Sequence, residues 1–191
     1  MTTKVHGFLI EDGAITSEKI EDSAILNGHL VSGEIIYNLR DTGPAGGLIF
    51  YDKGFESDGW RYLEAAPNDQ SIIQWYNGSY DETSAIATSI GTGITNTPLI
   101  VSIQGAGSYA AQLCDDLIID IYDDWFLPSK YELNYMYTEL HYNGVGGFAD
   151  NGYWSSSELN DDIAWFQNFG DGNQLNFYKY STYWVRAVRA F

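Results

Sequence analysis

Residue types that usually perform catalysis are present in this sequence, but they do not gather into a catalytic motif. Three consecutive serines at 155–157 lack the flanking glycines of a nucleophile elbow. The histidines His6, His29 and His141 are scattered, so a Ser–His–Asp site would have to use His141. Cys114 fits the apolar side of a predicted helix, which favours a core residue over a nucleophile. Because H-E-x-x-H, P-loop and dinucleotide motifs are also absent, we expect no enzymatic activity.

Pairs of neighbouring aspartates are the other chemical candidates, and they occur at 115–116, 123–124 and 161–162. Calcium needs six or more oxygens that converge on one point, and none of these pairs has the EF-hand spacing. We therefore expect solvated surface acids and neither a metal nor a cofactor, with a calcium site near the last pair as the alternative. Because Cys114 is the only cysteine, a disulfide framework within the chain and a cysteine-based zinc site are excluded.

Residues 159–183 combine tyrosine, phenylalanine and leucine with asparagine, aspartate, serine and glycine, without a clear period. Tyrosine, serine, glycine and asparagine are the residues of antibody paratopes, where rigid rings and adaptable hydrogen bonds make contacts. Two interpretations stay open on composition alone: a ligand-binding surface, or an ordinary aromatic β core with polar loops.

The charge balance narrows the partners that the protein can bind. In 191 residues there are 9 Lys and Arg against 26 Asp and Glu, a formal net charge of -17. Such a field repels phosphate backbones and anionic lipid, so we expect neither nucleic-acid binding nor membrane insertion. The first residues contain no apolar segment of the signal-peptide type, and we expect synthesis in the cytosol without export by that route.

Residues 1–40 differ from the rest of the chain because they contain a ten-residue repeat. Apolar residues recur at Ile10, Ile20 and Leu30. Repeats with so few apolar positions bury them by stacking on neighbours or on other copies. Residues 1–40 are therefore either an extended arm lying on the main domain or an oligomerising stalk. A cluster of turn residues at 41–47 separates this arm from one domain at 41–191.

The domain should be of the α+β class. Residues 48–51 and 60–66 read as paired strands, Asp171-Gly172 predicts a hairpin turn, and residues 183–191 alternate as one closing strand.

Two helices are expected between these strands. One spans 96–117 with an interruption at Gly105, and the other begins at Ser129, which has the capping-box spacing to Glu132. Residues 68–95 read as irregular.

Several long motifs of the domain resemble a known family. They are GGLIFY at 46–51, IGTG at 90–93, YAAQLC at 109–114, DWFLPSKYEL at 124–133, GGFA at 146–149, YWSSSE at 153–158 and VRAVRAF at 185–191. This pattern is similar to the C-type lectin-like fold of bacterial and phage surface domains, in the branch that includes the variable proteins of diversity-generating retroelements. The repeats of the arm, for their part, resemble phage tail fibres, which are commonly trimeric.

The resemblance implies a variable region at 153–191. In that family, mutation of template adenines changes the first two bases of asparagine codons, which cannot yield Trp, Met, Gln, Lys or Glu. The fixed positions implied here are Trp165, Gln167, Gln174, Lys179 and Trp184. The implied variable, ligand-binding positions are Leu159, Asn160, Asp161, Asp162, Ile163, Phe166, Gly170, Asp171, Asn173, Leu175, Asn176, Phe177, Tyr178, Tyr180, Ser181 and Tyr183.

The resemblance further implies a receptor-recognition protein at a virion tail tip, in preference to a cell surface. Its ligand would be a host-surface protein or glycan, and its arm would form a homotrimer. Five aromatic residues are expected to be exposed anchors: Phe166, Phe177, Tyr178, Tyr180 and Tyr183. The alternatives are a lectin module of fixed specificity and a structural tail-fibre tip subunit. A formylglycine-generating enzyme of the broader fold is disfavoured because it needs more than one cysteine.

Overall fold

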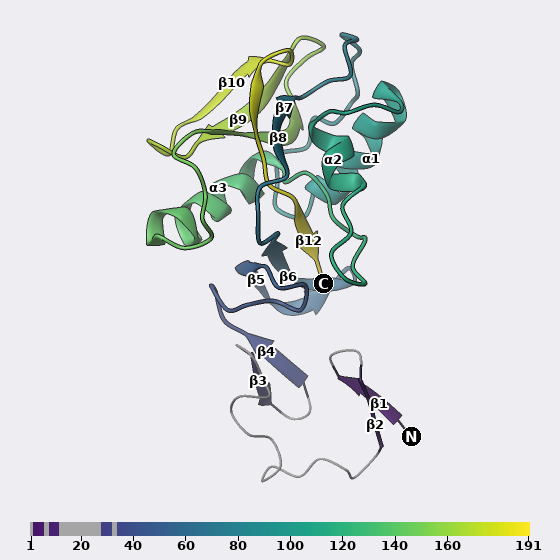
Figure 1. Ribbon diagram of the computed structural model, residues 1–191, viewed down its shortest axis with the longest axis vertical. Helices are drawn as coiled ribbons and strands as arrows, with labels where there is room; N and C mark the ends of the chain where they lie inside the picture. Colours follow the sequence, from purple (N-terminus) through teal and green to yellow (C-terminus); the bar gives the residue numbers. More distant parts are fainter. Residues whose placement is uncertain (1, 6–7, 12–27, 32–33) are drawn as a thin grey trace.

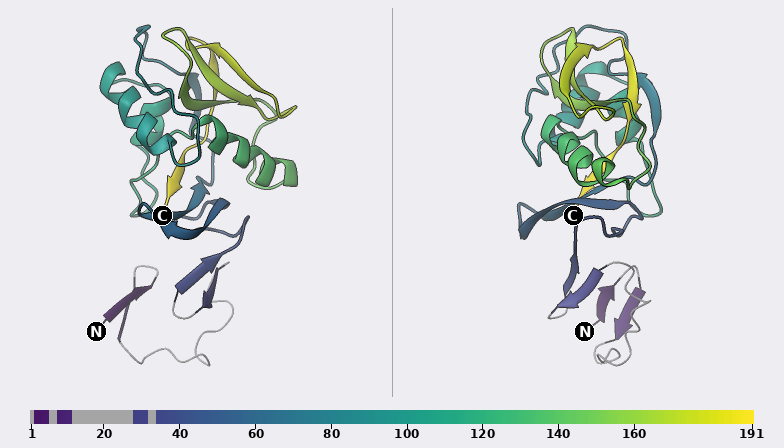
Figure 2. Two further views of the ribbon diagram at one scale, coloured as in Figure 1. Left: turned by 180° about the vertical axis from the view of Figure 1, so that it is seen from behind. Right: turned by 90° about the vertical axis from the view of Figure 1, so that its left-hand side faces the viewer.

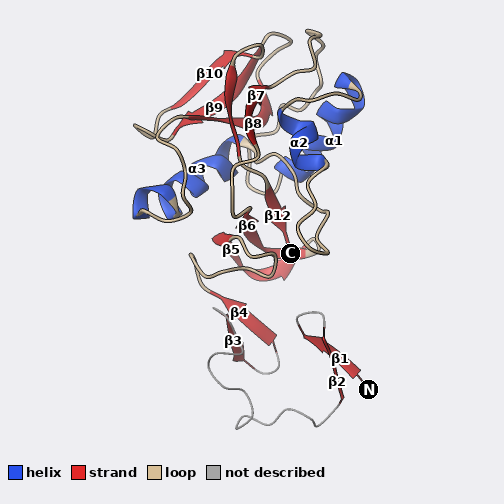
Figure 3. Cartoon of the chain, viewed as in Figure 1, coloured by secondary structure: helices blue, strands red, loops and turns tan. Residues whose placement is uncertain are grey.

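The computed structural model describes residues 2–5, 8–11, 28–31 and 34–191, and shows a mixed α+β protein (Figure 1). The predicted fold class is confirmed at this level. Figure 3 shows helices and strands interleaved along the chain, with long loops between them. In the described part of the chain, no helix has the length and apolar character needed to cross a membrane.

The N-terminal strands form two hairpins, each a separate two-stranded antiparallel sheet. The hairpins pair β1 (Thr2–Val5) with β2 (Phe8–Glu11) and β3 (Gly28–Val31) with β4 (Glu34–Tyr37). Most of the predicted repeat lies outside the described residues, so its homotrimer stays a prediction. Tyr37 at the end of β4 is buried against Ile49, Tyr62 and Phe191, which ties this strand to the main body.

A small antiparallel sheet lies next to the hairpins at one end of the main body (Figure 1). Its strands are β5 (Leu48–Ser57), β6 (Trp60–Ala65) and β12 (Val188–Ala190), in the order β12-β6-β5. The predicted pairing of 48–51 with 60–66 is confirmed. Asp58 and Gly59 both have positive φ, as the type I′ turn between two twisted strands requires.

A larger five-stranded sheet carries the C-terminal half of the domain. Its strands are β7 (Ser71–Gln74), β8 (Gly152–Glu158), β9 (Ile163–Asn168), β10 (Gln174–Tyr178) and β11 (Thr182–Val185). The order is β10-β9-β8-β11-β7, with β8 and β11 parallel and the other neighbours antiparallel. The predicted hairpin turn at Asp171-Gly172 is confirmed, since it joins β9 to β10. Residues 68–95 are not wholly irregular, because they contain β7.

Helices cover both faces of this sheet (Figure 2). They are α1 (Gly93–Gln104), α2 (Ala110–Asp115), α3 (Lys130–Glu139) and the 3-10 helix η1 (His141–Asn143). One core cluster joins α1 and α2 to the face that contains Trp154, and another joins α3 to the face that contains Tyr153.

The prediction of two helices is wrong in number. The first predicted helix divides at Gly105, whose φ of 69° lies outside the range of a right-handed helix, and the chain resumes as α2. The capping box of α3 is confirmed, because Ser129 and Glu132 exchange both of its hydrogen bonds.

The prediction of one closing strand is also wrong. The chain leaves the large sheet after β11 and enters the small sheet as β12. At the crossing, the buried Arg186 guanidinium lies 2.6 Å from an Asp69 carboxylate oxygen and donates to the carbonyl of Ala66. The Ala187 amide donates to the Gln70 side chain instead of to a neighbouring strand.

Candidate ligand-binding surface

The sixteen predicted ligand-binding positions lie on the β9–β10 hairpin and on the chain flanking it, between β8 and the start of β11. Three of them are half-buried, Ile163, Ser181 and Tyr183, and one is buried, Phe166. The exposed ones are Leu159, Asn160, Asp161, Asp162, Gly170, Asp171, Asn173, Leu175, Asn176, Phe177, Tyr178 and Tyr180. We call the fifteen positions other than Phe166 the displayed surface.

The expectation that Phe166 is an exposed anchor is wrong, since it is only 7% exposed. Alternation along β9 directs Ala164 and Phe166 toward the core that α1 and α2 cover. The Phe166 ring stacks on Tyr183 with centroids 4.5 Å apart and planes at 6°, and it meets Trp154 edge to face. Phe166 is therefore part of the floor beneath the displayed surface.

Aromatic contacts continue from this floor to the solvent. Phe177 on β10 meets Phe166 and Tyr183 edge to face, at centroid distances of 6.2 Å and 5.9 Å. Tyr178 and Tyr180 stack on each other at 5.4 Å with planes at 11°. The rings of Phe177, Tyr178 and Tyr180 are 44–51% exposed and also contact one another or the rings beneath them. They therefore offer a large contact area and lose little conformational entropy when a ligand binds.

The five positions implied to be fixed make internal contacts instead. Gln167 is fully buried and donates from Nε2 to Asn134 Oδ1 and to the carbonyl of Gly172, at 3.1 Å and 3.0 Å. Gln174 donates from Nε2 to the carbonyl of Lys130 at 2.7 Å. Both glutamines thus attach the hairpin to α3.

The two tryptophans that the resemblance implies to be fixed pack on the same face of the sheet. The Lys130 ammonium lies 3.3 Å from the centroid of the Trp165 ring, and burial lowers the pKa of this lysine. Trp184 stacks with Tyr153 at a centroid distance of 6.4 Å. These contacts attach the inner face of the displayed strands to α3 and to β8.

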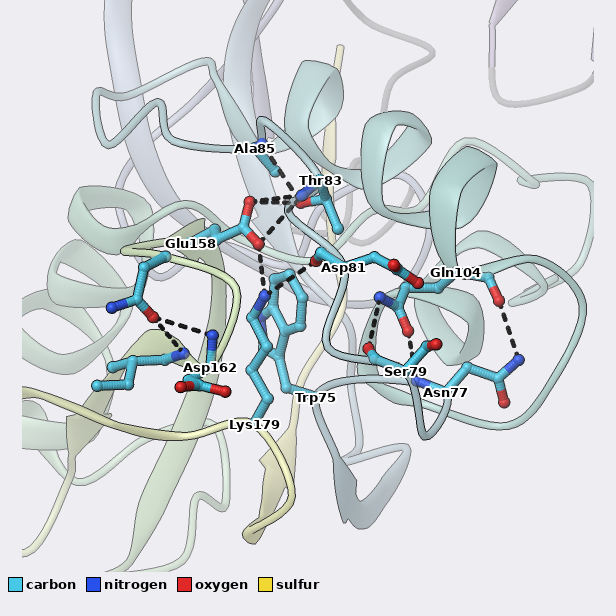
Figure 4. A network of polar contacts seen from close by, with 12 residues as sticks. Trp75, Asn77, Ser79, Asp81, Thr83, Ala85, Gln104, Glu158, Asp162 and Lys179 are labelled. Atoms are coloured by element: carbon cyan, nitrogen blue, oxygen red, sulfur yellow. Dashed lines mark hydrogen bonds and ion pairs between the residues drawn. The ribbon is translucent and has the colours of Figure 1, made fainter.

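The fifth fixed residue, Lys179, forms an ion pair with Glu158, and neither side chain is exposed (Figure 4). The carboxylate also accepts hydrogen bonds from the amide and the hydroxyl of Thr83, each at 2.8 Å. The Lys179 ammonium donates to the carbonyl of Asp81 at 3.4 Å, and its backbone amide donates to the carbonyl of Asp162 at 2.9 Å. One buried pair therefore holds together three segments that are distant in sequence.

The structure adds residues that the sequence interpretation missed. Tyr76 and Tyr80 follow β7, and their rings lie 5.0 Å apart. Their segment lies beside the displayed surface, because the amide of Trp75 donates to the carbonyl of Lys179 at 3.0 Å. Asn77 fixes their loop through hydrogen bonds to the side chain and the carbonyl of Gln104, at 2.8 Å and 3.0 Å. Residues 74–80, QWYNGSY, share the aromatic and small polar composition of 159–183, which is the signal that could have found them.

The serines and the cysteine that the sequence offered as catalytic candidates make contacts inside the fold. Ser155 and Ser157 donate their hydroxyl protons to the carbonyls of Trp165 and Ala87, at 2.8 Å and 2.7 Å. The prediction that Cys114 is a core residue is confirmed, since it is fully buried, and burial raises the pKa of its thiol.

The remaining candidates are one histidine and the acidic groups. His141 Nε2 lies 3.2 Å from a carboxylate oxygen of the exposed Asp150. Among the residues that the structure describes, no three His, Cys, Asp or Glu side chains are grouped so that they could hold a metal ion.

Comparisons with known proteins leave the family of this chain open. The sequence matches no model of a protein family, and it has no match among curated proteins.

Proposed function

We propose that this chain is a receptor-recognition protein that displays a diversified ligand-binding surface on a C-type lectin-like domain, residues 41–191. Its variable segment is 153–191, its ligand is a host-surface protein or glycan, and its place is a viral tail tip. The arm, residues 1–40, joins copies into a homotrimer.

The observation that carries this proposal is the separation of two residue classes within one short segment. Of the sixteen implied variable positions, all but Phe166 are exposed or half-buried, while the five interleaved Trp, Gln and Lys residues are buried or half-buried and make internal contacts. Substitution at exposed positions usually costs little stability, whereas removal of a buried contact costs much. The five implied fixed positions, all of residue types that adenine mutagenesis cannot create, make internal contacts of this kind.

The arrangement of the domain supports display as well. The β9–β10 hairpin lies at the end of the main body away from the N-terminal hairpins, and β12 returns to the small sheet next to them (Figure 1, Figure 2). Attachment through the arm therefore leaves the displayed surface free to meet a target.

A selection experiment tests the proposal. The fifteen positions of the displayed surface are randomised, with Phe166 and the five fixed residues retained, and the library is panned on phage against hen egg-white lysozyme. We expect folded binders with dissociation constants of about 1 μM or better. A control library is varied at exposed residues of α1, among them Ile94, Leu99 and Ile103. Equal recovery from both libraries, or recovery from neither, would overturn the proposal.

A further inference from the structure

Four tyrosines at the edge of the displayed surface form two ring pairs, which we call the tyrosine patch. Tyr178 and Tyr180 stack at 5.4 Å with planes at 11°, and Tyr76 and Tyr80 lie at 5.0 Å with planes at 38°. Tyr80, Tyr178 and Tyr180 are 47%, 47% and 51% exposed, so much of their ring surface is open to solvent. Only the 178–180 pair belongs to the implied variable region.

The two pairs are brought together by the buried lysine between the stacked tyrosines. Through its amide, Lys179 donates to the carbonyl of Asp162. Through its ammonium it donates to the carbonyl of Asp81, the neighbour of Tyr80 (Figure 4). A hydrogen bond to Tyr76 raises the pKa of Tyr80, and the nearby charge of Asp162 raises it further. The amide of Trp75, the neighbour of Tyr76, donates to the carbonyl of Lys179 at 3.0 Å, so the two pairs meet at this lysine.

The surroundings of the tyrosine patch carry negative charge that nothing in the described part of the chain neutralises. Four exposed acids form no ion pair with any described cation: Asp81 and Asp162, whose carbonyls accept hydrogen bonds from Lys179, and their sequence neighbours Glu82 and Asp161. Of the seven lysines and arginines between residues 35 and 191, six pair with carboxylates and the seventh, Lys130, lies over Trp165. None of the seven lies over a ring of the patch.

We propose that the tyrosine patch binds the cationic side chain of an arginine or lysine on a partner protein. The faces of aromatic rings attract cations, and a planar guanidinium can stack on a tyrosine while donating hydrogen bonds to an adjacent carboxylate. The acids exclude anionic glycans by like-charge repulsion. This inference rests on the proposed function and narrows its ligand to a protein with a basic residue at the contact. Tyr76 and Tyr80 form a constant half of the site beside a variable half.

A titration with a matched pair of small probes tests the inference. The full chain, labelled with 13C in its tyrosine rings, is titrated with Nα-acetyl-arginine amide and with Nα-acetyl-citrulline amide, which has the same shape without the charge. We expect the arginine probe to shift the ring signals of Tyr80, Tyr178 and Tyr180, with at least tenfold weaker binding of the citrulline probe.

Three variants test whether the arginine probe binds at the tyrosine patch. Tyr80→Ala and Asp162→Asn should each weaken arginine binding at least threefold, while Tyr142→Ala, which removes a 78% exposed ring outside the patch, should not change it. Equal shifts by the two probes, or no shift by either, would overturn the inference. The lysozyme selection above is independent of this outcome, because binders without basic contacts would sustain the proposed function while the cation site failed.

Discussion

The Lys179 ammonium and the Glu158 carboxylate form an ion pair, closed to solvent, beneath the displayed surface. Each partner adjoins a displayed segment, because Glu158 immediately precedes Leu159 and Lys179 stands between two exposed tyrosines. Thr83 donates two hydrogen bonds to the same carboxylate, so the loop that follows Tyr80 is held as well. The ion pair and the hydrogen bonds from Thr83 therefore hold the ends of these loops together.

Removing one partner of this pair should destabilise the whole domain. Lys179→Met leaves the Glu158 carboxylate buried without a countercharge, and we expect the free energy of unfolding in urea to fall by about 3–5 kcal/mol. The double variant Lys179→Met, Glu158→Gln should recover part of this loss, because no buried charge remains. Lys130→Met, which removes a lysine from the Trp165 ring, should cost at most about 1 kcal/mol. Similar losses for the two lysines would contradict the structural role of Lys179.

The displayed tyrosines should behave in the opposite way. Tyr178→Ala and Tyr180→Ala remove half-exposed rings, so each should change the free energy of unfolding by less than about 1 kcal/mol. Binding of a partner selected on the unsubstituted surface should weaken in both variants. Thermal unfolding and surface plasmon resonance on the same samples separate the two effects, and a large drop in melting temperature would count against a display role.

Phe166 and Phe177 allow a direct comparison of a buried ring with an exposed one, because they lie on neighbouring strands and contact each other. Phe166→Ala should cost about 3–5 kcal/mol, the usual range for a buried phenylalanine. Phe177→Ala, at a side chain that is 44% exposed, should cost clearly less. Chemical denaturation measures the free energy of unfolding of both variants. Equal losses of this free energy would mean that Phe177 is also part of the core.

Glu132 should make stability depend on pH. Its carboxyl is fully buried at the capping box of α3, and burial raises its pKa to about 7 although the amides of Ser129, Gly91 and Gly93 donate to it. Because the folded state then binds the proton more tightly than the unfolded chain, the stabilising contribution is complete below the ordinary pKa and is lost as pH rises through about 7. Unfolding free energies at pH 5 and pH 8 should therefore differ more in the wild type than in Glu132→Gln. Parallel pH profiles would refute this assignment.

Local patterns in the sequence predicted much of the scaffold. Adjacent residues suffice for the Asp171-Gly172 turn, the paired strands at 48–51 and 60–66, and the capping box that starts at Ser129. The division of the closing strand was not predictable in this way, because it depends on Arg186 meeting Asp69 across the fold.

The same limit applies to the candidate site. Composition and the family resemblance identified the displayed residues, but alternation alone could not say that Phe166 faces a core built by α1 and α2. Nor could it show that Tyr76 and Tyr80 join the surface, since β7 reaches it only by pairing with β11. A lysine in a polar segment reads as solvated, and only the distant Glu158 explains the burial of Lys179.

The most direct test of a diversified surface is deep sequencing of codons 153–191 across a population of the source of this gene. The account predicts substitutions concentrated in the displayed positions, arising at template adenines, with constant codons for Trp165, Gln167, Gln174, Lys179 and Trp184. A uniform sequence, or substitutions that fall equally on these five codons, would contradict it and favour a lectin of fixed specificity or a structural fibre tip.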